Sequence, residues 1–249
     1  MAQDSTPLAS AKVTVASWDV DACNRLTTAA LGRHMQETAE LSAARMGASF
    51  HELRRANQTW VLSGLLLRIE RSPGFQDQIT VQTWPRDIVR RRALRDFRIL
   101  DASDVVIATA TTSWYCIDLD RRRPVDPGQW RTSPWLADER ATDRDPDKLP
   151  GVTEPVAETS VPLRWCDLDL NGHLTNTRYQ ELVLECYEES WLREKEVAEI
   201  ELNFLAEGHY PETLLSRRQP DPDGVDAWHH DLVRQSDGKP ICRARVVWR

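Results

Sequence analysis

The chain of 249 residues lacks the marks of several protein classes. No apolar run reaches the roughly 20 residues that a membrane-spanning helix needs. Met1 to Ser10 has neither the basic start nor the apolar core of a secretory signal. The Gly-x-Ser-x-Gly elbow of serine hydrolases and a glycine-rich phosphate-binding loop are both missing. We therefore expect a protein without signal peptide, transit peptide or membrane anchor.

Cysteine is scarce, and histidine is scattered. The cysteines are odd in number and unclustered, so we expect a reducing, cytoplasmic location. They are Cys23, Cys116, Cys166, Cys186 and Cys242. Most histidines show no ligand spacing with cysteine or aspartate, so we expect no metal ion and no cofactor. These histidines are His34, His51, His209, His229 and His230. The net charge of −7 argues against a nucleic-acid partner.

Proline is concentrated in one stretch of an otherwise ordinary globular composition. Seven of the fourteen prolines fall between Pro124 and Pro162. Proline removes backbone donors and interrupts helices and sheets, which is typical of a surface linker. We predict a first domain over residues 1–134, a linker over 135–158 and a second domain over 159–249.

Four polar residues alternate just before a helical pattern in the second half of the chain. They are Asp167, Asp169, Asn171 and His173. In an extended segment their side chains would line one face. His173 would then lie near a helix N-terminus, where an oxyanion is favoured. The alternative is a turn or cap cluster, because such side chains also bind their own backbone.

The same stretch has a degraded copy 148 positions earlier, in Trp18 to Thr27. The matching residues of the copy are Asp19, Asp21, Leu26 and Thr27. Cys23 stands in the place of Asn171, and Arg25 in the place of His173. A residue present in both copies suggests a structural role, whereas Asn171 and His173 are peculiar to the second.

A second internal match joins the ends of the two halves. Residues 93–114 align without a gap with residues 227–248, 134 positions later. Repeats of this kind decide the architecture. They predict two copies of one domain, of which only the second kept asparagine and histidine.

Each half shows a helical pattern followed by β-rich runs, which predicts an α+β fold. In the first half we expect an extended segment over 14–20, a helix over 29–46, and strands over 60–70, 79–84, 93–100 and 105–116. In the second half we expect a helix from Thr175 or Asn176 to about Glu194, and strands over 199–205, 213–216, 227–234 and 240–248.

In their order, these features resemble an acyl-ACP thioesterase. The resemblance rests on Asp-x-Asp-x-Asn-x-His, the adjoining helix, and Glu207 thirty-four residues after His173. It continues through residues 35–39, 83–85 and 94–97 and so covers nearly the whole chain. It implies tandem hotdog domains, each a long helix wrapped by an antiparallel sheet. The first would hold the acyl chain, and the second would supply catalysis.

Carried over by position, the catalytic set of that family would be Asp169, Asn171, His173 and Glu207. Asp169 also has a counterpart in Asp21, so a structural role competes with a catalytic one. Two positions depart from plant members. Thr175 stands where they often have asparagine, and Gly208 stands where they have cysteine. A cysteine nucleophile at position 208 is therefore excluded.

Thioester hydrolysis needs an activated water and donors for the tetrahedral oxyanion. The thiol departs easily, because its pKa is near ~8.5. Glu207 would act as the general base or orient it, and His173 would relay a proton or donate to the carbonyl. Asn171 would hold water or the carbonyl, and Asp169 would orient His173 or the loop.

The sequence thus predicts a hydrolase of fatty acid biosynthesis that releases free fatty acid from acyl-acyl carrier protein. One alternative is a thioesterase for acyl-CoA or another aliphatic thioester. A hotdog dehydratase would need a different His/Asp set. A non-catalytic acyl-binding protein would have no reason to keep Asn171, His173 and Glu207 together.

A basic cluster interrupts this acidic chain. Its members are Arg86, Arg90, Arg91, Arg92, Arg95 and Arg98. Arg90, Arg91 and Arg92 form its centre, and acyl carrier protein, a strongly acidic partner, could bind there. A solvated hairpin face is the alternative. The sequence is compatible with a homodimer but does not fix the oligomeric state or the acyl chain length.

Overall fold

The structure is a computed structural model that describes residues 7–131 and 133–249. The expectation that Met1 to Ser10 carries no leader falls mostly on residues 1–6, outside the described residues. Within the described part, no helix is both long and apolar enough to cross a membrane.

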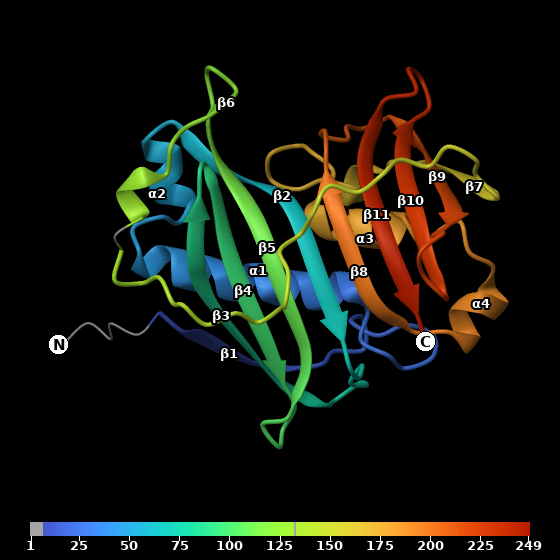
Figure 1. The fold of residues 1–249 in the computed structure, drawn as a ribbon, viewed down its shortest axis with the longest axis horizontal. Coiled ribbons are helices and arrows are strands. Elements are labelled where there is room, and N and C mark those ends of the chain that lie inside the picture. The colour runs from blue at the N-terminus through green and yellow to red at the C-terminus, as the bar shows by residue number, and fades with distance from the viewer. Residues whose placement is uncertain (1–6, 132) are drawn as a thin grey trace.

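The described residues form one antiparallel sheet, with the helices α1 and α3 on one face (Figure 1). Strands of the first half are β1 (Ala9–Thr14), β2 (Gln58–Ile69), β3 (Gln78–Val89), β4 (Arg92–Leu100), β5 (Val106–Asp118) and the short β6 (Arg123–Pro124). Strands of the second half are β7 (Ala157–Pro162), β8 (Val197–Phe204), β9 (Thr213–Pro220), β10 (Ala227–Arg234) and β11 (Pro240–Trp248). The spatial order is β1-β3-β4-β5-β2-β8-β11-β10-β9-β7, with β6 beside β5. Read outward from the centre, both halves have the same order, as a duplication predicts.

The two halves meet at the pairing of β2 with β8. Leu67 lies opposite Ile200 in this pairing, and both side chains are fully buried. Burying an aliphatic side chain of this size contributes about 1.5–3 kcal/mol. One hydrophobic core runs from Phe97 in the first half to Val246 in the second. The halves therefore share both a sheet and a core.

The first helix, α1 (Thr28–Arg45), lies within one residue of its predicted range at each end. Thr27 begins it, and its hydroxyl accepts a hydrogen bond from the Ala30 N–H at 3.1 Å. Leu31 and Met35 are buried on the face that packs on the sheet. At Gly32 an added Cβ would lie 2.6 Å from Gln180 Nε2, so the missing side chain allows α3 to approach. Figure 1 shows α1 crossing behind the strands of the first half.

The predicted long helix of the second half is wrong. Two short helices, α3 (Asn176–Leu182) and α4 (Glu189–Glu194), replace it. Between them the Tyr187 N–H donates to the carbonyl of Leu184, three residues earlier, and not to the carbonyl four residues earlier as in an α-helix. At this point the Tyr187 ring packs in a buried aromatic cluster, with its centroid 4.8 Å from that of the Trp248 ring. Tertiary packing therefore overrides a continuous amphipathic pattern.

Local contacts also change the predicted segment over 14–20. The first strand ends at Thr14, and the chain then turns. The Asp19 carboxylate accepts the Ala16 N–H at 3.1 Å, and Val20 pairs only with Leu26 in an isolated bridge. The other predicted strands are present, and β3 continues five residues beyond its predicted end at Trp84. Helix α2 (Phe50–Arg55) was not predicted, although Ser49 and Glu52 form a capping box there.

The proline-rich segment crosses the face of the sheet opposite to α1 and α3 (Figure 1). Arg144 pairs with Glu201 at 2.6 Å, and the Leu149 N–H binds Asn203 at 2.7 Å. Glu201 and Asn203 alternate along β8 with the core residues Ile200 and Leu202. The predicted linker is thus held against the outer surface, and its last two residues already belong to β7.

Candidate active site

Asp169 organises the loop that carries the predicted catalytic residues. Its carboxylate accepts the Asn171 N–H at 2.8 Å and the His173 N–H at 3.3 Å. Its own N–H donates to the His173 carbonyl at 2.8 Å. Gly172 has a φ of 78°, a conformation that glycine adopts without strain. The loop is therefore a closed turn that returns the chain from Asp169 to His173.

The first half contains the same turn. The Asp21 carboxylate accepts the Cys23 N–H at 2.8 Å and the Arg25 N–H at 2.9 Å. The Asp21 N–H donates to the Arg25 carbonyl, as Asp169 does to His173. Asp21 and Asp169 thus have the same backbone role, and the loops differ in the side chains they present.

The expectation that four alternating side chains line one extended face is wrong. Trp165–Asp167 is a short 3₁₀ helix, and Asp167 turns inward and is buried. Burial raises the pKa of the Asp167 carboxyl. Hydrogen bonds from Arg164 and the charge of Arg178 outweigh that effect, so the pKa lies below its usual value. Asp167 is a structural residue, as its match with Asp19 suggested.

Glu207 reaches this turn from the end of β8. Its Oε1 lies 3.6 Å from His173 Nδ1, although 34 residues separate the two in the chain. The buried Tyr179 hydroxyl fixes the Glu207 loop, since it donates to the Ala206 carbonyl and accepts the Gly208 N–H, each at 3.2 Å. A Cβ at Gly208 would lie 3.2 Å from the Leu174 side chain, so any residue larger than glycine would be tight here.

Asn171 faces the first half of the chain. Its Oδ1 accepts a hydrogen bond from Arg54 of α2, and its Nδ2 donates to Asp169 Oδ2 at 3.3 Å. The second Nδ2 hydrogen is left for another acceptor. The structure therefore brings Asp169, Asn171, His173 and Glu207 to one wall.

Three further residues at this wall were not predicted from the sequence. Arg54 contacts Asn171, Arg122 contacts Glu207 Oε2 at 2.7 Å, and His209 Nε2 lies 3.9 Å from the same oxygen. The arginines come from the first half, and no local pattern connects them with the catalytic loop. His209 had one signal, its position two residues after Glu207.

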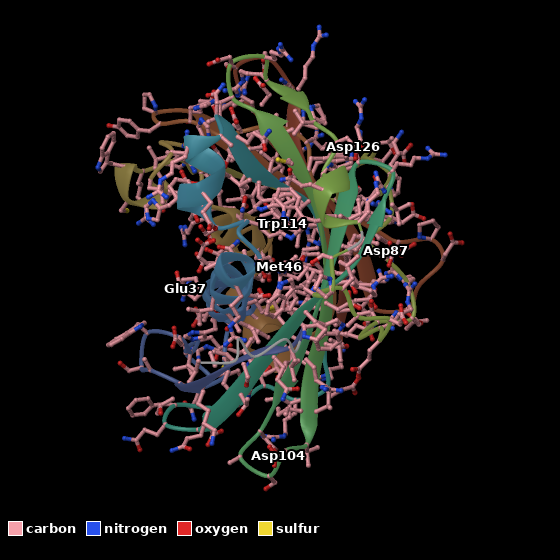
Figure 2. The ribbon with its side chains drawn as sticks, turned by 90° about the vertical axis from the view of Figure 1, so that its left-hand side faces the viewer. Glu37, Met46, Asp87, Asp104, Trp114 and Asp126 are labelled. Atoms are coloured by element: carbon pink, nitrogen blue, oxygen red, sulfur yellow. The ribbon has the colours of Figure 1, made fainter. Side chains whose placement is uncertain are left out.

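These residues line a cleft of about 710 Å³ between the two halves. Thr59, Trp60 and Asn176 also line a second cavity of about 240 Å³, between α1 and the first half of the sheet. The cleft and the cavity therefore adjoin. Figure 2 shows Met46 and Trp114, which line the second cavity, between α1 and the sheet, with Glu37 pointing away.

The second cavity has mainly apolar walls and one half-buried arginine. Ala43, Met46 and Trp130 contribute apolar surface. Arg95 lines the wall as well, where its guanidinium donates to Thr83 Oγ1 at 3.3 Å. Burial lowers the pKa of Arg95 to about 10. The cavity can hold an aliphatic chain that enters from the cleft.

The basic cluster divides into paired and unpaired arginines. Arg86 is buried and pairs with Asp96 at 3.1 Å, and Arg98 pairs with Glu139 at 2.8 Å. Arg90 and Arg91 are exposed in the turn between β3 and β4, and Arg92, the first residue of β4, is half-buried. Among the described residues, no carboxylate lies within 4.0 Å of these three guanidinium groups. The Arg91 side chain reaches the Pro124 carbonyl at 3.5 Å, two residues beyond Arg122.

The sequence matches the models of two known protein domains. The acyl-ACP thioesterase N-terminal domain matches residues 8–127, and the acyl-ACP thioesterase C-terminal domain matches residues 153–249. The chain belongs to the acyl-ACP thioesterase family.

Two plant relatives show how much of an acyl-ACP thioesterase is represented here. The chain is 27% identical to the chloroplastic palmitoyl-acyl carrier protein thioesterase of Cuphea hookeriana over 94% of its own length. It is 26% identical, over the same share, to the chloroplastic acyl-[acyl-carrier-protein] hydrolase FATB2 of Cuphea viscosissima. It spans 60% and 61% of these two relatives.

Solved structures of acyl-ACP thioesterases share the fold. One from Bacteroides thetaiotaomicron superposes with a TM-score of 0.88 at 24% identity, over 100% of both chains. The 12:0-ACP thioesterase from Umbellularia californica gives 0.86 at 21% identity, over 98% of this chain and 97% of that one. The predicted α+β fold of tandem hotdog domains is confirmed, with the second helix interrupted as described.

Proposed function

We propose that this protein hydrolyses the thioester between a fatty acyl chain and acyl carrier protein, and releases free fatty acid. The observation that carries the proposal is the approach of His173 Nδ1 to Glu207 Oε1, at 3.6 Å on the cleft wall. A carboxylate and an imidazole that can together accept a proton, beside an amide donor and an apolar cavity, fit thioester hydrolysis. The family and the names of its relatives support acyl carrier protein as the carrier.

In the proposed mechanism, water attacks the thioester carbonyl carbon and passes its proton to the Glu207–His173 pair. Asn171 Nδ2 donates to the developing oxyanion. The tetrahedral intermediate then collapses, the C–S bond breaks, and the departing sulfur takes up the proton. Loss of one oxyanion donor typically costs roughly 2.7–4 kcal/mol of barrier.

The acyl chain would extend from the cleft into the cavity under α1. Thr59 and Trp60 stand where the two spaces adjoin. Lining residues come from both halves, so neither half alone would complete the site. We also propose a cytoplasmic location, which the five free cysteines support.

The experiment is thiol release from a panel of acyl-ACPs and matching acyl-CoAs. We expect hydrolysis that prefers acyl-ACP and falls about 100-fold or more in Glu207→Gln and His173→Ala. Of the two, the variant with the larger loss identifies the proton acceptor. Turnover of acyl-CoA alone would show that the substrate is acyl-CoA and not acyl-ACP. No turnover of either carrier, with acyl chains still bound, would make this an acyl-binding protein.

A further inference from the structure

Three side chains at the cleft offer ligand atoms that lie close enough together to hold one metal ion. We propose that His173, Glu207 and His209 bind a divalent transition-metal ion such as Zn²⁺, and that the bound ion blocks hydrolysis. One ligand atom from each residue lies within 4.8 Å of the other two. The fold creates this set, because His173 and His209 belong to loops 36 positions apart in the chain.

The spacing is close to that of a coordination sphere. His173 Nδ1 lies 3.6 Å from Glu207 Oε1, and His209 Nε2 lies 3.9 Å from Glu207 Oε2. The two imidazole rings meet edge to face, with centroids 5.0 Å apart. Bonds of about 2.0–2.1 Å in tetrahedral geometry place ligand atoms roughly 3.4 Å apart. Small side-chain rotations in partly exposed loops supply the difference.

The donor types select the metal. Two imidazoles and one carboxylate are a common zinc set, in which water or substrate takes the fourth position from the cleft. Mg²⁺ and Ca²⁺ require mostly oxygen ligands. Among the three residues only Glu207 offers oxygen, so these hard cations should not bind here. A transition metal can therefore be recognised without competition from abundant Mg²⁺.

Arg122 controls access to the ion. Its guanidinium lies 2.7 Å from Glu207 Oε2, an oxygen that the metal would take, and its charge repels a dication. The Arg122 side chain is 67% exposed. An exposed ion pair of this kind opens readily. Removal of the Arg122 charge should therefore tighten metal binding.

The inhibitory part of the proposal rests on the proposed function, whereas the binding part does not. A metal on Glu207 and His173 occupies both groups that would accept the proton of water. Its expected effect is loss of thioester hydrolysis in proportion to occupancy. Chelation should restore the rate.

The test uses the full, metal-free chain. Co²⁺ binding is followed by visible absorption, and Zn²⁺ and Mg²⁺ binding by calorimetry. We expect one Co²⁺ or Zn²⁺ per chain, no Mg²⁺ binding, and no thiolate-to-metal band from Cys23 or Cys166. Affinity should fall at least about tenfold in His209→Ala and rise in Arg122→Gln. The matched control is His51→Ala, on exposed α2, which should bind like the wild type.

Failure of Co²⁺ and Zn²⁺ to bind, or equal affinity in folded His209→Ala, would overturn the metal site. Circular dichroism checks the fold of each variant. If hydrolysis is present, half-inhibition of His209→Ala should need at least about tenfold more Zn²⁺ than half-inhibition of the wild type. If hydrolysis is absent, the binding measurements still decide the metal site, so the two proposals fail separately.

Discussion

At the scale of single residues, the two copies of one turn separate structure from chemistry. Asp21 and Asp169 accept equivalent backbone N–H groups, and each donates to the carbonyl four residues on. The side chains that differ are Cys23 against Asn171 and Arg25 against His173. An aspartate that both copies need for the backbone carries no information about the reaction.

This comparison predicts different outcomes for the same substitution. Asp21→Ala should lower the free energy of unfolding by about 1–2 kcal/mol, because two backbone donors lose their acceptor, and leave hydrolysis unchanged. Asp169→Ala should cost similar stability and also slow hydrolysis, because the turn positions Asn171 and His173. Urea denaturation and thiol release measure the two effects. Equal rates for both variants would assign Asp169 no influence on catalysis.

His230 makes stability depend on pH. Burial lowers its pKa to about 3 from 6.5, and the ring lies 3.1 Å from the Tyr187 hydroxyl. Below pH 6.5 the unfolded chain takes up a proton that the folded chain refuses. The free energy of unfolding should therefore fall as pH drops from 6.5 toward 3, by up to about 1.4 kcal/mol per pH unit.

Above pH 6.5 both states leave the His230 ring neutral, so the residue adds no pH dependence there. Urea denaturation at several pH values checks this. His230→Gln keeps an acceptor for Tyr187 but cannot titrate. In this variant the free energy of unfolding should lose the part of its pH dependence that comes from His230. His51→Ala, on the surface, should retain it. An identical slope in His230→Gln would contradict the assignment.

Local sequence revealed part of the site and hid the rest. Asn171 and His173 stood out because they sit in a repeat whose other copy lacks them. Glu207 came from the family resemblance, and the fold places it 3.6 Å from His173. Arg54 and Arg122 could not be found, since their contacts join different halves of the chain.

At the scale of elements, sequence patterns succeeded where one contact face decides the structure. Helix α1 has one buried face and a threonine cap, and its range was predicted within one residue. The second helical pattern was equally regular, but Tyr187 packs into an aromatic cluster formed by strands distant in sequence. Periodicity identifies the buried face but does not show that packing interrupts the helix.

The cavity beneath α1 gives a prediction for this element. Ala43 lines the cavity, and Ala43→Leu adds three carbons to a space of about 240 Å³. We expect kcat/KM for the longest accepted acyl chain to fall roughly tenfold or more, with shorter chains little affected. Ala44→Leu, on the exposed side of the same helix, is the matched control. An unchanged chain-length profile in Ala43→Leu would show that acyl chains do not enter this cavity.

At the scale of the whole molecule, the two copies act as one unit. They share a sheet through β2 and β8 and a continuous core. The duplication and the fold class could be predicted from internal repeats and the family resemblance. Both joining strands were predicted, but their pairing with each other was not, because neither repeat match covers β2 or β8.

The charge distribution of the molecule predicts how the carrier binds. Arg90, Arg91 and Arg92, at the turn between β3 and β4, have no carboxylate partner in the described part of the chain and lie beside the strand that follows Arg122. Reversal of all three to glutamate should raise KM for acyl-ACP, and the increase in KM should be larger at low salt. Turnover of acyl-CoA should change less. Steady-state kinetics at two ionic strengths measure this. Unchanged kinetics with acyl-ACP would exclude the turn as a docking surface.

In the proposed mechanism, the second copy of the turn performs the chemistry and the first does not. The most direct measurement compares equivalent positions of the two turns, as the rate of thiol release from acyl-ACP by Asn171→Ala and Cys23→Ala. We predict a loss of about 100-fold or more for Asn171→Ala and the wild-type rate for Cys23→Ala. A folded Asn171→Ala protein with the wild-type rate, or an equal loss in both variants, would contradict the account.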